Sequence, residues 1–127
     1  MIEVLCVGAG GFVGAAARYL LGLIPYEGDF PLITFAINFA GAVAIGAIMG
    51  CVDARAGLPA NAVLFLKTGL CGGFTTFSTF SLETLSLFER GHALLGCGYA
   101  GTSLVACVLG VLLGKTIARA ALGGQAA

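Results

Sequence analysis

Four long apolar stretches, separated by short polar connections, constrain this chain more than any other feature of its sequence. They cover about 4–24, 32–52, 62–88 and 94–113. A helix needs about 20 residues to cross the hydrocarbon core of a bilayer, so each stretch is long enough for one crossing. The pattern predicts an all-α membrane protein in which residues 1–127 form a single domain of four transmembrane helices.

The composition excludes most soluble classes. Only 9% of the residues are charged and 59% are hydrophobic, with a mean hydropathy of +1.06, whereas a soluble domain carries roughly 25% charged residues. Six basic and six acidic residues give no net charge, so we expect no nucleic-acid partner. The five cysteines form no CxxC pair, and we expect them to pack as small free thiols.

Basic residues are divided almost evenly between the two ends of the predicted bundle. An even number of spans puts both termini on one side. That side carries Arg55, Lys67, Lys115 and Arg119, and the other side carries Arg18 and Arg90. Because the positive-inside rule orients a membrane protein through such differences, this small difference is compatible with insertion in either orientation.

Small residues recur at helical spacing in every predicted span. The pairs are Gly10 and Gly14, Gly46 and Gly50, Gly69 and Gly73, and Gly110 and Gly114. Small residues four positions apart let helix backbones approach closely within a membrane. The repeated spacing therefore predicts a tightly packed bundle.

The third stretch contains a predicted break. Within Thr68–Phe80, the adjacent glycines Gly72 and Gly73 are followed by a run of hydroxyls and by paired phenylalanines. Non-helical backbone at membrane depth is tolerated only where it is buried in protein or lines a cavity. We therefore expect irregular backbone at Gly72–Gly73, and a binding or conduction site beside it.

Few polar side chains lie within the spans, and several have two interpretations. Thr34 and Asn38 share one face of the second span; Asn38 is either an interhelical hydrogen-bonding residue or a donor to an anion. Arg18 either extends to the interface or draws anions into a vestibule, and Lys67 presents the same choice.

The helix after the break carries two neighbouring stripes. Phe77, Phe80 and Thr84 form one stripe, and Thr76, Thr79 and Glu83 form the next. A carboxylate inside a membrane must be partnered, protonated or hydrated. The two stripes together indicate a wet, narrow pathway.

In the fourth span, Tyr99 is either an interface anchor or, with Ser103 four residues later, part of a polar track. His92 is expected to be solvated. The sequence contains neither a catalytic triad nor a phosphate loop, and we predict that the protein is not an enzyme.

These motifs resemble those of the Fluc (CrcB) fluoride channels over essentially the whole chain. Three segments carry the resemblance: Gly10–Tyr19; Thr34 and Asn38 with Gly41 and Gly46; and Gly69–Phe80 with Glu83 after it. The resemblance implies an antiparallel, dual-topology homodimer in the bacterial plasma or inner membrane. Such a dimer would export fluoride passively from the cytoplasm and so confer fluoride resistance.

The resemblance also implies roles for individual residues. Asn38, Phe77 and Phe80 would face fluoride. A polar track would include Ser78, Thr79, Glu83, Tyr99, Ser103 and Thr34, with Arg18 in the vestibule. The backbone carbonyls of Gly72 and Thr75 would hold a structural Na⁺ at the centre of the dimer.

Elementary chemistry agrees with this assignment, although other functions remain open. Amide N–H groups, hydroxyls and the positive edges of aromatic rings suit a small anion, and freed carbonyls suit a hard cation. One alternative is a proton-coupled exporter that uses Glu83 as its proton carrier. Another is an assembly subunit in which Asn38 and the glycines only pack.

Overall fold

The computed structural model describes residues 1–54 and 57–123, and its regular structure there is helical, so the predicted all-α class is confirmed. Three helices are long and apolar enough to cross a membrane: α1 (Ile2–Gly22), α2 (Leu32–Asp53) and α6 (Ala93–Gly123). The residues 55–56 and 124–127 lie outside the described part, and so does the predicted charge at Arg55.

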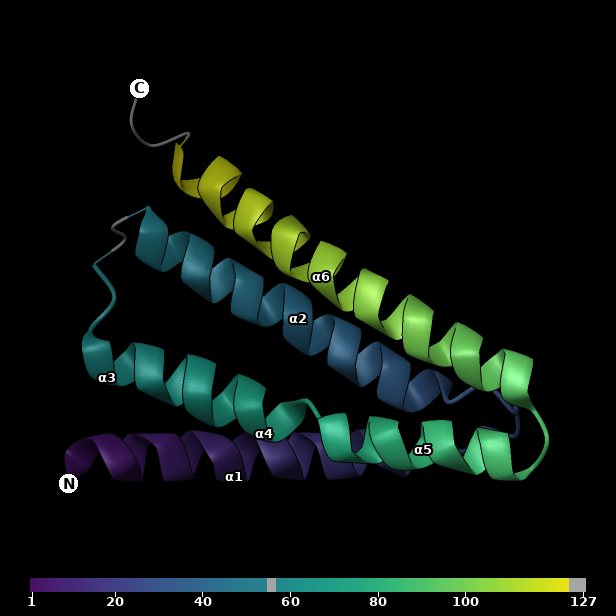
Figure 1. Ribbon diagram of the computed structural model, residues 1–127. Coiled ribbons are helices and arrows are strands. Elements are labelled where there is room, and N and C mark those ends of the chain that lie inside the picture. Colours follow the sequence, from purple (N-terminus) through teal and green to yellow (C-terminus); the bar gives the residue numbers. More distant parts are fainter. Residues whose placement is uncertain (55–56, 124–127) are drawn as a thin grey trace.

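The third predicted stretch forms a series of shorter helices. These are α3 (Ala60–Val63), the π-helical η1 (Leu64–Cys71), α4 (Gly72–Phe74) and α5 (Phe77–Glu89). Figure 1 shows that they follow one another in a single row, and α3, η1 and α4 pack against α1. The N-terminus and the last turns of α6 lie at the same end of the molecule, as an even number of passes requires.

The bundle consists of two tightly packed helix pairs. Helix α1 packs against η1 and α4, and α2 packs against α6. Every predicted glycine pair lies at one of these contacts; for example, a methyl group on Gly14 would collide with the Leu70 carbonyl, and one on Gly46 would collide with the Val111 carbonyl. The prediction of close backbone approach is confirmed.

Helix α6 continues well beyond residue 113, where hydropathy places the end of the fourth span. Two basic residues on the added turns explain the difference, because both reach the end of α2. Lys115 Nζ lies 2.9 Å from Asp53 Oδ2, and Arg119 Nη2 lies 3.2 Å from the same oxygen. These ion pairs join the ends of the two helices.

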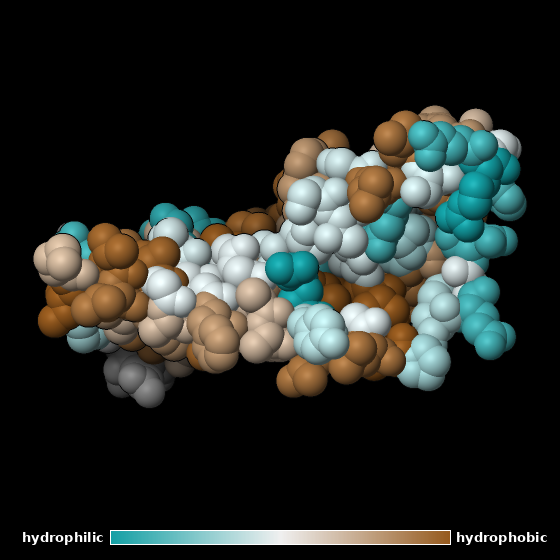
Figure 2. Space-filling model, turned by 90° about the horizontal axis from the view of Figure 1, so that it is seen from below, coloured by the Kyte–Doolittle hydropathy of each residue, from teal (hydrophilic) through white to brown (hydrophobic). Residues whose placement is uncertain are grey.

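The surface matches a chain that spans a bilayer. Figure 2 shows hydrophobic residues over much of one face, with hydrophilic residues gathered mainly towards one end. Large apolar side chains such as Phe12 and Leu94 are 76% and 89% exposed. Such exposure is normal when lipid replaces water as the solvent.

Candidate functional site

The break in the third span lies at Thr75 and Thr76. Thr75 has φ −80° and ψ 157°, and Thr76 has φ −148° and ψ 113°, so both are extended. The Thr76 hydroxyl then accepts a bond from the Thr79 N–H at 3.1 Å and caps the start of α5. A threonine at this position suits both roles, since β-branched residues favour extended backbone and threonine is a good N-cap.

The expectation of irregular backbone at Gly72–Gly73 is wrong, because both residues belong to helix α4. Gly73 serves packing instead: a methyl group there would collide with the Gly11 carbonyl of α1. The break therefore begins three residues after the first of these glycines, where a capping hydroxyl and a partner from α2 are available.

Asn38 of α2 supplies that partner. Its Nδ2 donates to the Thr76 carbonyl at 3.1 Å, and its Oδ1 accepts from the Thr76 N–H at 2.8 Å. The two bonds satisfy both the N–H and the carbonyl of Thr76, as the backbone of a neighbouring β-strand would do. Asn38 is thus an interhelical hydrogen-bonding residue, and its second amide hydrogen has no acceptor among the described residues.

The break changes the bonding of two carbonyl oxygens. The Thr76 N–H, which would bond the Gly72 carbonyl in a continuous helix, donates to Asn38 instead. Thr75 has left the helix, and the Thr79 N–H bonds the Thr76 hydroxyl. The carbonyls of Gly72 and Thr75 are therefore acceptors without their usual helix donors.

Arg18 of α1 reaches the same region. Its Nε donates to the Gly73 carbonyl at 3.1 Å, near the end of α4. The residue also lines a cavity of about 350 Å³ together with Thr34, Thr76 and Thr79. Arg18 therefore satisfies a carbonyl at the break and faces a polar cavity as well.

Glu83 of α5 is fully partnered within the bundle. Its Oε1 accepts from the Thr34 hydroxyl at 2.7 Å, and its Oε2 accepts from the Tyr99 hydroxyl at 2.8 Å. Tyr99 is completely buried, so it is not an interface anchor. The carboxylate of α5 thus joins α2 to α6.

Aromatic rings run beside this carboxylate. The Phe77 and Phe80 centroids lie 5.3 Å apart, and the Phe80 and Tyr99 centroids 5.2 Å apart. Phe77 is 79% exposed, although it stands at the break. Ser78 is also exposed, and its hydroxyl lies 3.2 Å from that of Thr76.

A groove of about 640 Å³ contains four of the nine predicted pore residues and both predicted Na⁺ residues. Its polar and aromatic lining comes from α2, η1, the break, α5 and α6, and comprises Asn38, Lys67, Thr68, Cys71, Thr75, Thr76, Phe77, Phe80, Ser103 and Cys107. No acidic side chain lines it within the described part of the chain. Ser103 Oγ is buried there without a hydrogen-bond partner.

The structure therefore divides the predicted site residues into two groups. Asn38, Gly72, Thr75, Phe77, Phe80 and Ser103 line the groove. Thr34, Thr79 and Arg18 line the smaller cavity, and hydrogen bonds connect Thr34 to Glu83 and Glu83 to Tyr99. Ser78 belongs to neither group, because it is exposed beside Thr76 and lines neither cavity. Thr76 lines both cavities and stands between the two groups.

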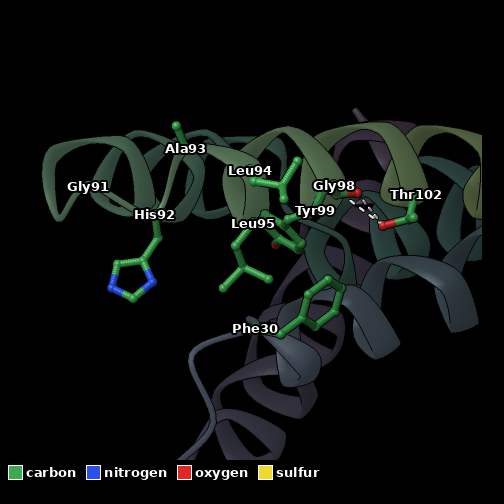
Figure 3. Close-up of a pocket in the computed structure, with 9 residues that line it drawn as sticks. All are labelled: Phe30, Gly91, His92, Ala93, Leu94, Leu95, Gly98, Tyr99 and Thr102. Carbon is green, nitrogen blue, oxygen red and sulfur yellow. Dashed lines mark hydrogen bonds between the residues drawn. The ribbon is translucent and has the colours of Figure 1, made fainter.

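A third pocket, of about 470 Å³, lies where α5 turns into α6 (Figure 3). Its polar side chains are not directed at a common point. The Thr102 hydroxyl bonds back to the Gly98 carbonyl at 2.6 Å, and the exposed His92 ring extends away from α6. The described residues of this pocket therefore do not form a recognisable binding or catalytic site.

Sequence reasoning did not identify two features of the site. One is the ring of Phe30, which packs edge-on against Tyr99 at 5.3 Å. The other is the bond from Arg18 to the Gly73 carbonyl. Both depend on contacts between segments far apart in the chain, for which no local pattern exists.

Comparison with known proteins gives a consistent result. The profile of one family, described as CrcB-like protein, Camphor Resistance (CrcB), matches residues 5–115. A protein of Ruminiclostridium cellulolyticum named fluoride-specific ion channel FluC is 43% identical over 122 residues, covering 94% of each chain. A protein of the same name from Chlorobaculum tepidum is 47% identical over 121 residues, covering 91% of this chain and 96% of its own.

Proposed function

The chain belongs to the CrcB family, and on that premise we propose that it is a fluoride-specific ion channel of the bacterial cell membrane. It lets fluoride leave the cytoplasm passively and so confers fluoride resistance. Both relatives bear the name of an ion channel and not of an enzyme. The relatives match over nearly their whole length, so the proposal concerns the entire activity.

The observation that carries the proposal is the chemistry of the groove. Its lining offers donors without protein acceptors, namely the second amide hydrogen of Asn38 and the hydroxyl of Ser103, and it contains no described carboxylate. An anion that enters a channel must exchange water for donors in the wall. A cation would find few ligands among these side chains.

The two phenylalanines extend this surface. Phe77 and Phe80 both line the groove, and the edge of an aromatic ring is positive. A ring edge offers an anion a weak site, which favours release as much as capture. These rings therefore suit conduction better than tight binding.

A polar track continues the path beyond the break. Thr79 and Arg18 face the smaller cavity, and Thr34 and Tyr99 hold Glu83 beside it. Ser78 extends the same series of hydroxyls at the surface. We assign Arg18 to an aqueous vestibule, where its charge raises the local concentration of anions.

A structural Na⁺ at the break is part of the proposal. The residues fit it, because the Gly72 and Thr75 carbonyls have lost their helix donors, and carbonyl oxygens are ligands for hard cations. When bound, the ion would stabilise these carbonyl oxygens in place of the lost N–H donors. We expect purified protein to lose thermal stability when Na⁺ is replaced by N-methylglucamine; equal stability in both would contradict this site.

The proposed assembly is an antiparallel homodimer. The groove is open, and Phe77 at its edge is exposed. A second copy would provide the missing wall. The near-even distribution of basic residues is compatible with one chain inserting in both orientations.

Fluoride efflux from liposomes that contain the purified protein tests the function, with chloride as the control ion. We expect fast fluoride efflux driven by voltage alone, and at least about a hundredfold slower chloride efflux if the donor wall selects small anions. Efflux that requires an opposing proton gradient would identify an exporter. Absence of efflux would identify an assembly subunit.

A further inference from the structure

Lys67 differs from the other basic residues that the structure describes. Arg18 donates to the Gly73 carbonyl, Arg90 donates to the Ser86 carbonyl, and Lys115 and Arg119 both pair with Asp53. Lys67 takes part in none of the hydrogen bonds or ion pairs of the described residues. Its side chain is exposed and lines the groove, five residues before Gly72.

The neighbouring Thr68 also has an unused donor. Four other threonines bond the carbonyl four residues earlier, as Thr84 does to Phe80 and Thr116 does to Leu112. The Thr68 hydroxyl makes no such bond within the described part of the chain. Thr68 lies in the π-helical η1, in which backbone bonds run between residues five apart, and this altered turn accounts for the difference.

Both residues line a groove that contains further hydrogen-bond donors among its apolar residues. The groove also contains Asn38, with one unused amide hydrogen, and Ser103, a residue that is only 6% exposed and whose hydroxyl is unpartnered. No described carboxylate lines the groove, so the Lys67 ammonium has no internal counter-ion. An ionisable residue within a membrane-spanning segment indicates a function and calls for a partner.

We propose that Lys67 and Thr68 form a capture site for small hydrated anions at the mouth of the groove. This inference rests on the proposed function, in which the groove conducts fluoride. The Lys67 charge concentrates anions at the entrance, and the Thr68 hydroxyl replaces part of the hydration shell. Asn38 and Ser103 then offer the next donors deeper in the groove.

The expected signature is a dependence of flux on ionic strength. A charge at an aqueous mouth raises the capture rate of a counter-ion, and dissolved salt screens this attraction beyond about 10 Å at 0.1 M. Removing the charge should therefore slow conduction mainly in dilute salt. A lysine that only contacts lipid phosphate would leave flux unchanged at every salt concentration.

The test compares initial rates of fluoride efflux from liposomes for the wild-type protein, Lys67→Met and Lys67→Arg. We expect Lys67→Met to be about fivefold slower at about 20 mM ionic strength and less than about twofold slower at about 500 mM. Lys67→Arg should stay within about twofold of wild type, because it keeps the charge. Thr68→Val should slow efflux, whereas Thr68→Ser should not.

Lys115→Met is the matched control, since Lys115 lies outside the groove and Arg119 still pairs with Asp53. It should behave as wild type. If the wild-type protein passes no fluoride, the proposed function fails and this inference falls with it. If the wild type conducts but Lys67→Met equals it in dilute salt, only this inference is overturned. The inference also requires that the fluoride efflux rate of the wild-type protein falls as ionic strength rises. A wild-type rate that does not fall would overturn the inference even if Lys67→Met fails to assemble.

Discussion

Asn38 is the single side chain on which the break in the third span depends most. It gives the Thr76 backbone both a donor and an acceptor at 3.1 and 2.8 Å, in a setting where lipid supplies neither. Its two possible roles, packing and anion binding, are therefore compatible. The amide is fixed by Thr76, and its remaining hydrogen is held in one direction.

We expect Asn38→Ala to weaken fluoride flux about tenfold or more, because two backbone groups at the break lose their partners at about 1–3 kcal/mol each. Fluoride efflux from liposomes measures the change. Asn61→Ala is the control, since Asn61 is an exposed residue of α3 that lies outside the groove. Unchanged flux in Asn38→Ala would return Asn38 to a packing role alone.

Phe80 tests the aromatic part of the wall. Replacement by isoleucine keeps an apolar side chain of similar size but removes the positive ring edge. We expect Phe80→Ile to reduce fluoride flux at least about tenfold, because a site on the path is lost, while size-exclusion chromatography shows an unchanged assembly. Phe12→Ile, on the exposed face of α1, should conduct normally. Normal flux in Phe80→Ile would remove Phe80 from the pathway.

At the scale of the elements, the spacing of glycines in the sequence predicted the contacts between helices correctly but placed the break in the third span too early. The glycine pairs could be recognised because a four-residue period is local to one helix, and Gly73 indeed packs on Gly11. The break was placed too early because adjacent glycines suggest flexibility, whereas its position depends on Asn38 in another helix. The π-helical turn of η1 has no known local signal.

Gly14 tests the importance of this close approach. We expect Gly14→Ala to destabilise the protein by about 1–3 kcal/mol, since the added methyl group would push α1 away from Leu70. Thermal unfolding in detergent measures the loss. Gly8→Ala is the matched control, because nothing lies within 4 Å of a methyl group there. A stability loss that is equal in both variants would show that helix propensity, not packing, dominates.

At the scale of the whole molecule, one chain supplies only part of a pathway. Thr76 lines both the groove and the smaller cavity, and Phe77 of the groove is 79% exposed. Hydropathy could predict the three long apolar helices α1, α2 and α6, since lipid imposes a minimum length on a span, but not how far α6 continues. It could not predict what covers the groove, because lipid and a second helix bundle favour the same apolar surface residues.

Dual topology can be tested by fixing the orientation of the chain. Ala60→Lys with Asn61→Lys adds positive charge at the end that carries the N-terminus, and Glu27→Lys with Glu89→Lys adds it at the other end. Each pair of substitutions should drive the chain towards one orientation.

If the channel needs both orientations, each variant alone should conduct poorly, and co-expression of the two should restore fluoride resistance and flux by at least about tenfold. The comparison uses cells that lack their own fluoride exporters, with expression of each chain matched by immunoblot. Full activity of either variant alone would rule out the antiparallel dimer, because a chain confined to one orientation cannot form it. A parallel dimer or a monomer gains nothing from a partner of opposite orientation. Neither could therefore explain why the two variants restore fluoride flux together when each fails alone.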